Sequence, residues 1–198
     1  MRRNFLLILL GLIVSPSAFS DSPLTSTSFY EAYLNEPMVQ YAIETKQFDE
    51  KIIEFLLNDK SLVDVKAAVI NALGWSHIDD RAMVFKQRLQ VKYGDIPLES
   101  YSAADLMCLA YIRCMDNYFE LGEGVNWIET ALNKNPESLT IQMISALING
   151  QVAMDNNWCE VWKTCSLALN MPRQYNDFKT AAVQNIVDYM IIYKPYCE

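Results

Sequence analysis

Thiols are the most reactive side chains in this sequence, which contains five of them. The cysteines are Cys108, Cys114, Cys159, Cys165 and Cys197. The first two and the next two are each six residues apart, a helical rise of about 9 Å, whereas a disulfide allows roughly 7 Å between Cα atoms. A disulfide must therefore join different helices, and we predict Cys159–Cys197 because the last two helices are expected to run antiparallel. Cys108 and Cys114 are expected to be small buried side chains, and the odd count leaves a free thiol or an intermolecular bond.

His77 is the only histidine, which excludes any site that needs two imidazoles. The run His77-Ile78-Asp79-Asp80 offers three side chains that could bind a metal ion, but Asp79 is better explained as the cap of the following helix. Pairing of His77 with a cysteine nucleophile needs only spatial proximity, yet no local signature supports it. No Gly-x-Ser-x-Gly elbow and no Gly-x-x-x-x-Gly-Lys phosphate loop occurs in the sequence. We therefore predict no metal ion, no cofactor and no enzymatic activity.

Four acidic residues and two tryptophans near predicted turns are candidates for binding rather than catalysis. Glu120 and Glu123 could form a glycosidase carboxylate pair, but solvated residues at a helix junction explain them better. Trp158 and Trp162 are spaced for packing between helices, whereas tryptophans near turns are expected to be exposed and to anchor partners. The candidate partner-binding residues are Trp75, Asp79, Asp80, Glu120, Glu123 and Trp127.

The first twenty residues have the three zones of a secretory signal peptide. Arg2 and Arg3 provide a positive start, Phe5 to Val14 form an apolar run, and Ala18-Phe19-Ser20 resembles a cleavage site. A membrane anchor is the alternative, but ten apolar residues span only about 15 Å of helix, against about 30 Å for a bilayer core. We predict cleavage after Ser20, export to the periplasm and no stable membrane insertion of the mature chain.

The charge of the mature chain limits its partners. Cleavage removes two arginines and no acidic residue, so the formal net charge changes from −8 to −10. Nucleic acids and anionic membrane surfaces are bound by cationic side chains, so neither is expected as a partner. A basic protein partner is compatible with this charge, as is a purely solubilising role.

The spacing of apolar residues predicts the helices that carry the candidate residues. Apolar residues recur three and four apart between residues 29 and 193, which predicts an all-α fold of about eight helices stacked as antiparallel helical hairpins. Ser102 and Asp105 resemble a capping box, and residues 106–119 and 136–154 are apolar on nearly all sides and are expected at the centre. The domains are therefore a signal peptide at 1–20, a mobile leader at 21–28 and a single helical domain at 29–198.

Part of the chain resembles a known helical repeat. The matching residues are Gly124, Ile128, Ala131 and Asn135-Pro136. Residues 105–136 resemble a tetratricopeptide unit in their second half. Their first half departs from the pattern, with Ile112 where a small residue is expected. The resemblance implies a helical hairpin and nothing more specific.

These observations lead to a non-catalytic binding role. We expect a periplasmic protein-binding domain, and first of all an immunity-type inhibitor of a bacterial toxin that acts in the cell envelope. The profile on which this expectation rests is a small, exported, acidic and compact chain. A helical-repeat scaffold or adaptor in envelope assembly and an envelope hydrolase with an unrecognised site are the alternatives.

Overall fold

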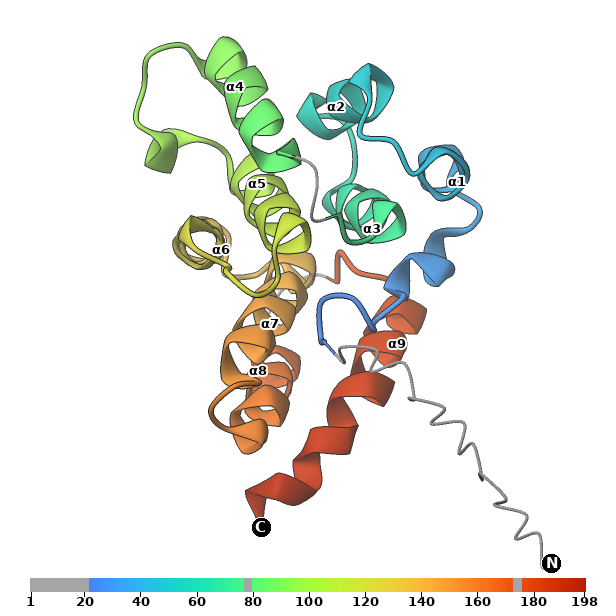
Figure 1. The fold of residues 1–198 in the computed structure, drawn as a ribbon, viewed down its shortest axis with the longest axis vertical. Helices are drawn as coiled ribbons and strands as arrows, with labels where there is room; N and C mark the ends of the chain where they lie inside the picture. The colour runs from blue at the N-terminus through green and yellow to red at the C-terminus, as the bar shows by residue number, and fades with distance from the viewer. Residues whose placement is uncertain (1–21, 77–79, 173–175) are drawn as a thin grey trace, which may run out of the picture.

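The computed structural model describes residues 22–76, 80–172 and 176–198, and every regular element in these ranges is a helix (Figure 1). The α-helices are α1 (Pro37–Thr45), α2 (Glu50–Leu57), α3 (Val63–Leu73), α4 (Arg81–Tyr93), α5 (Ala103–Asp116), α6 (Glu123–Lys134), α7 (Leu139–Ala153), α8 (Trp158–Asn170) and α9 (Thr180–Met190). Three 3-10 helices add η1 (Phe29–Tyr33), η2 (Leu98–Ser100) and η3 (Ile191–Cys197). The predicted all-α class is confirmed. The predicted signal peptide lies outside the described residues.

Two central helices are buried on nearly all sides, as predicted from their apolar surfaces. In α5 and α7 all but a few residues are buried. Each begins at a serine cap: Ser102 Oγ accepts the amide hydrogen of Asp105 at 3.1 Å, and Ser138 Oγ that of Ile141 at 3.2 Å. Such caps satisfy amides that the first helical turn leaves without partners. Local polar residues thus set where the buried helices begin.

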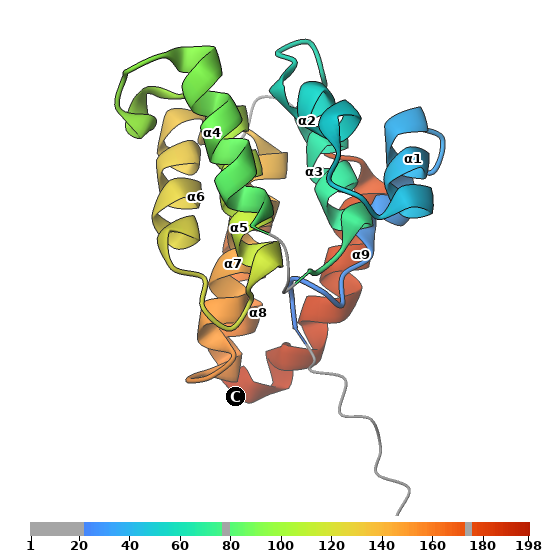
Figure 2. The same cartoon turned by 45° about the horizontal axis from the view of Figure 1, so that its top comes forward.

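Successive helices pack side by side around this centre. The closest neighbours are α5 with α6 and α7 with α8, while α4 lies on α5 and α1 to α3 form a group beside it (Figures 1 and 2). The helix α9 returns to η1 near the start of the described chain, where Tyr33 Oη accepts the amide hydrogen of Lys179 at 3.1 Å. The first helix and the last α-helix of the described residues are therefore in contact.

The predicted mobile leader is wrong for residues 22–28. Ser22, Leu24 and Thr27 are almost completely buried, and Ser22 Oγ is hydrogen-bonded to the side chain of Gln151. Thr27 Oγ1 donates to the carbonyl oxygen of Pro23 at 2.7 Å. The short hydroxyl side chains find partners within the fold, so a polar composition does not prevent this segment from packing.

None of the helices in the described part of the chain is both long enough and apolar enough to cross a bilayer.

Candidate functional site

Most of the predicted partner-binding residues lie at one junction, where the ends of α3 and α5 meet the beginnings of α4 and α6. Trp75 follows α3, Asp80 precedes α4, and Glu120 and Glu123 lie between α5 and the first turn of α6. The predicted residue Asp79, like His77, lies outside the described residues. We call the exposed residues Trp75, Asp80, Phe119, Glu120 and Glu123 the junction surface.

A buried ion pair positions the helices beneath this surface. Arg81 Nε lies 2.6 Å from Asp116 Oδ1, and the amide of Ala82 donates to Asp116 Oδ2 at 2.9 Å. Arg81 Nη1 donates to the carbonyl oxygen of Gly74 at 3.1 Å, which joins the same pair to the end of α3. Burial raises the pKa of Asp116, and the charge of Arg81 opposes this effect. Three helix ends are therefore held by one arginine.

Three aromatic rings at the same helix ends contact one another, and two of them reach the solvent. Trp75 is 43% exposed and its ring centroid lies 5.4 Å from that of Tyr118, which is buried. Phe119 stacks on Tyr118 at 4.2 Å between centroids and is 71% exposed. The amide of Ser76 donates to the carbonyl oxygen of Met115 at 3.3 Å, so the backbone next to Trp75 is tied to α5. Two large apolar side chains are thus presented to water on an ordered support.

The turn that carries Phe119 and Glu120 is shaped by its own residues. Asn117 Oδ1 accepts the amide hydrogens of Phe119 at 3.1 Å and Glu120 at 3.2 Å, a common use of asparagine in turns. Gly122 then has a φ of +54°, a backbone conformation that residues other than glycine rarely adopt. Gly124, in the first turn of α6, leaves no space for a side chain against α5, because an added Cβ would lie 2.7 Å from Cys114 Sγ.

The prediction that Trp127 is exposed is wrong. Trp127 is only 9% exposed, and Lys86 Nζ lies 5.1 Å from its ring centroid. The same Lys86 Nζ lies 3.9 Å from Glu123 Oε2, so this lysine connects α4 to α6 and covers the indole. Trp158, expected to pack between helices, contacts Tyr193 and Tyr196 of η3 and is 45% exposed. Nearness to a turn did not distinguish these tryptophans, because neighbouring helices decide which indole is covered.

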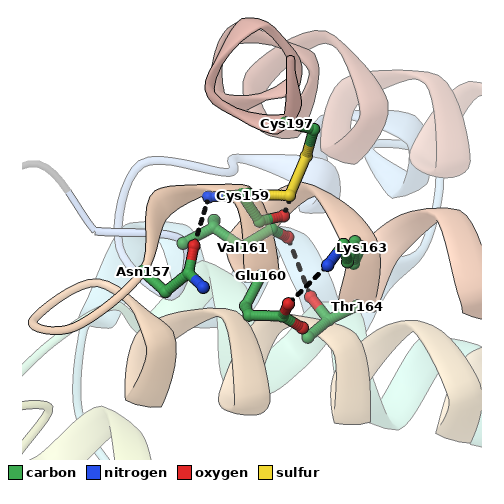
Figure 3. Close-up of a disulfide and its surroundings, with 7 residues drawn as sticks. All are labelled: Asn157, Cys159, Glu160, Val161, Lys163, Thr164 and Cys197. Carbon is green, nitrogen blue, oxygen red and sulfur yellow. Dashed lines mark hydrogen bonds and ion pairs between the residues drawn. A yellow bond between two sulfur atoms is a disulfide. The ribbon is translucent and has the colours of Figure 1, made fainter.

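The predicted disulfide between Cys159 and Cys197 is present (Figure 3). Cys159 lies in the first turn of α8 and Cys197 at the end of η3, with their Cα atoms 4.7 Å apart. The amide of Cys159 donates to Asn157 Oδ1 at 3.0 Å, which caps the helix next to the bond. The last segment of the chain is thus covalently joined to α8.

The remaining three cysteines are unpaired and buried, as predicted for Cys108 and Cys114. Burial raises the pKa of both thiols to about 12, and that of Cys165 to about 11. A thiol acts as a nucleophile only as thiolate, and these remain protonated at neutral pH. Their arrangement favours a packing role over nucleophilic chemistry.

A cluster of buried charges was not anticipated from the sequence. Asp105, predicted to belong to a capping box, accepts hydrogen bonds at Oδ2 from Lys92 Nζ at 2.9 Å and from Tyr93 Oη at 2.8 Å. Lys66 Nζ lies 4.0 Å from Asp105 Oδ1, and both side chains are almost completely buried. Burial lowers the pKa of Lys92, but its hydrogen bonds to Asp59 and Asp105 outweigh this effect and leave the pKa raised. Only the serine half of the predicted box forms, because the carboxylate is used between helices.

Cavities lined by described residues include two with polar side chains. One of about 300 Å³ lies where the start of α3 meets the residues before α9, and it is lined by Asp64, Asp177 and Phe178 among others. Burial raises the pKa of Asp64, whereas Asp177 accepts hydrogen bonds from Ser138 Oγ at 2.6 Å and from the amide of Thr140 at 3.1 Å. The other, of about 340 Å³, lies under the loop after α4. Among the described residues, no three His, Cys, Asp or Glu side chains are grouped so as to hold a metal ion.

No family model, curated protein or solved structure matches this chain. The tetratricopeptide resemblance stays limited to one hairpin, which α5 and α6 form. Ile128 and Ala131 are buried in this hairpin. Function has to be inferred from the residues themselves. The junction surface combines Phe119, which is 71% exposed, with three of the predicted acidic residues, Asp80, Glu120 and Glu123.

Proposed function

We propose that this protein is an exported, non-catalytic domain that binds a protein partner through the junction surface. The observation that carries the proposal is the exposure of Trp75 and Phe119 on a support fixed by the Arg81–Asp116 ion pair. Large aromatic residues are frequent energetic centres of protein interfaces, and an ordered support reduces the entropy lost on binding.

The charge of the chain favours a basic partner. Asp80, Glu120 and Glu123 are exposed at the same helix junction, although Lys86 lies close to Glu123. The mature chain carries a formal charge of −10 once Arg2 and Arg3 are removed from a total of −8. A negative field of this kind attracts a cationic partner and increases its rate of association.

We further propose that the partner is a toxin of a competing bacterium that acts in the cell envelope, which makes this protein an immunity-type inhibitor. The predicted signal peptide, the small acidic domain and the disulfide support this assignment, because disulfides persist in oxidising compartments such as the periplasm. Such an inhibitor needs a compact binding surface and no active site of its own.

Affinity capture of the tagged mature protein from envelope extract tests the binding surface. The wild-type protein should recover one basic protein in stoichiometric amount, and Trp75→Ala combined with Phe119→Ala should abolish recovery. Leu167→Ala is the matched control, because Leu167 is 67% exposed on α8, outside the junction surface. Equal recovery by the double variant and the control would contradict the role of the junction surface.

A growth assay tests the immunity role separately. Cells that lack this protein should grow normally alone and die when the toxin-producing competitor is added, and expression of the protein should restore survival. Poor growth in isolated culture, together with recovery of several envelope-assembly proteins, would contradict immunity and favour a scaffold.

A further inference from the structure

The disulfide joins α8 to a mostly exposed segment, the C-terminal helix η3. Of the seven residues of η3, only Tyr193 is buried, and Cys197 is exposed. The contacts of η3 with α8 are largely aromatic: the Trp158 ring centroid lies 6.3 Å from that of Tyr193 and 4.7 Å from that of Tyr196, and Lys194 Nζ lies 5.8 Å from the Trp162 ring. By contrast Ala182, Ile186 and Met190 of the preceding helix are buried. The attachment of the last residues therefore depends on the covalent bond more than that of α9 does.

From this arrangement we propose that the Cys159–Cys197 disulfide is a reducible latch, which a dithiol reductant opens while the rest of the fold stays intact. Opening releases residues 191–198 from α8 and uncovers the aromatic face that Trp158 and Trp162 form. This inference does not depend on the junction surface or on the identity of any partner.

The two sulfur atoms differ in a way that favours attack at one of them. Cys197 is exposed, so a thiolate of the reductant can approach its Sγ, whereas Cys159 is 9% exposed. Cys159 lies in the first turn of α8, where the partial positive charge of the helix end stabilises a departing thiolate. The neighbouring Glu160 carboxylate is paired with Lys163 Nζ at 2.6 Å, which reduces its opposing effect.

The exchange is balanced in two steps. The reductant thiolate forms a bond to Cys197 Sγ, the Cys159–Cys197 bond breaks, and Cys159 leaves with the electron pair and then takes up a proton. The second thiolate of the reductant attacks its own sulfur in this mixed disulfide, and Cys197 leaves and is protonated. The reductant loses two electrons and becomes a disulfide, and the protein gains two thiols. Cys165 takes no part, because it is buried and lies about 9 Å along the helix from Cys159.

Reduction of the folded mature protein tests the latch. The protein is incubated with dithiothreitol without denaturant, alkylated with iodoacetamide and mapped by mass spectrometry, while amide hydrogen exchange is followed along the chain. We expect two labels, on Cys159 and Cys197, and a loss of protection in residues 192–198 of at least about ten-fold with no change in α9, because local opening need not involve the whole fold.

Two variants serve as controls. Cys197→Ser should show the open exchange pattern without dithiothreitol, and Cys165→Ser should behave like the wild type. Labelling of Cys108 and Cys114 together with Cys159, or reduction only in denaturant, would overturn the proposal, since the bond would then open with the whole fold. Unchanged protection of residues 192–198 after reduction would overturn it as well.

Discussion

Arg81 and Asp116 form a nearly buried ion pair that joins the first residue of α4 to the last residue of α5, with Arg81 Nε 2.6 Å from Asp116 Oδ1. Neither residue belongs to the exposed surface that it supports. Because Asp116 also accepts the amide hydrogen of Ala82 and Arg81 donates to Gly74, loss of either side chain leaves several buried polar groups without partners. The pair therefore links the stability of the fold to the position of Trp75 and Phe119.

Asp116→Ala is expected to lower the free energy of unfolding by about 3 kcal/mol, because removal of one partner leaves the buried charge of Arg81 uncompensated. Urea denaturation at pH 7 measures the change. Arg88→Ala is the matched control: its pair with Glu50 is solvent-exposed and should contribute less than about 1 kcal/mol. Similar losses of unfolding free energy in the two variants would show that the buried Arg81–Asp116 pair contributes no more to stability than an exposed pair.

Asp64 and Asp49 are expected to affect stability with opposite dependence on pH. Burial raises the folded-state pKa of Asp64 above its usual 3.8, so the folded state binds the extra proton and loses stability as the pH rises from that value. Asp64→Asn should therefore increase stability at pH 7 relative to the wild type and remove this decline. Thermal unfolding between pH 3 and pH 7 measures both. No gain at pH 7 would contradict the assigned direction.

Asp49 provides the opposite case. The hydrogen bond from Tyr41 and then that from the amide of Ile52 lower its pKa below 3.8, so its contribution is present at neutral pH and is lost as the pH falls through the lowered value. Asp49→Asn should be less stable than the wild type at pH 7, and the difference should disappear in strong acid. Because Asp49 caps α2, Asp49→Ala should cost about 1 kcal/mol in urea denaturation. A difference that grows towards acid would contradict this reasoning.

Cys197→Ser is expected to lower the free energy of unfolding by about 2–4 kcal/mol, since the disulfide closes a loop with a sequence separation of 38 residues in the unfolded chain. Chemical denaturation without reductant measures the loss, and the wild type with dithiothreitol should approach the variant. If the variant and the oxidised wild type unfold at the same denaturant concentration, the disulfide does not constrain the unfolded chain as expected.

Gly124→Ala is expected to destabilise the protein by about 1–3 kcal/mol, because the new Cβ would lie 2.7 Å from Cys114 Sγ and 3.3 Å from the carbonyl oxygen of Ala110. Removal of the sulfur by Cys114→Ala should relieve part of this clash, so the double variant should lose less than the sum of the single variants. Thermal denaturation of the four proteins measures the coupling. Strict additivity would show that Gly124 is not limited by Cys114.

Much of the architecture was readable from the sequence, because helical periodicity and helix caps are local properties. The spacing of apolar residues identified the all-α fold and the two central helices, and Ser102 marked the start of α5. The Cys159–Cys197 bond was also predictable, since two successive antiparallel helices bring their far ends together. Trp75, Glu120 and Glu123 were also expected near turns, and they do lie at helix ends.

Tertiary structure decided which of these side chains meet solvent and which meet each other. Trp127 is covered by Lys86 from another helix, while Trp158 stays 45% exposed although it contacts the rings of Tyr193 and Tyr196. The Asp105 carboxylate does not cap its helix, because it pairs with Lys92 and Lys66 of two other helices. Residues 22–28 are also packed through contacts with residues far along the chain, such as that of Ser22 with Gln151. Burial and charge pairing depend on contacts between residues far apart in the chain, and a local pattern does not contain them.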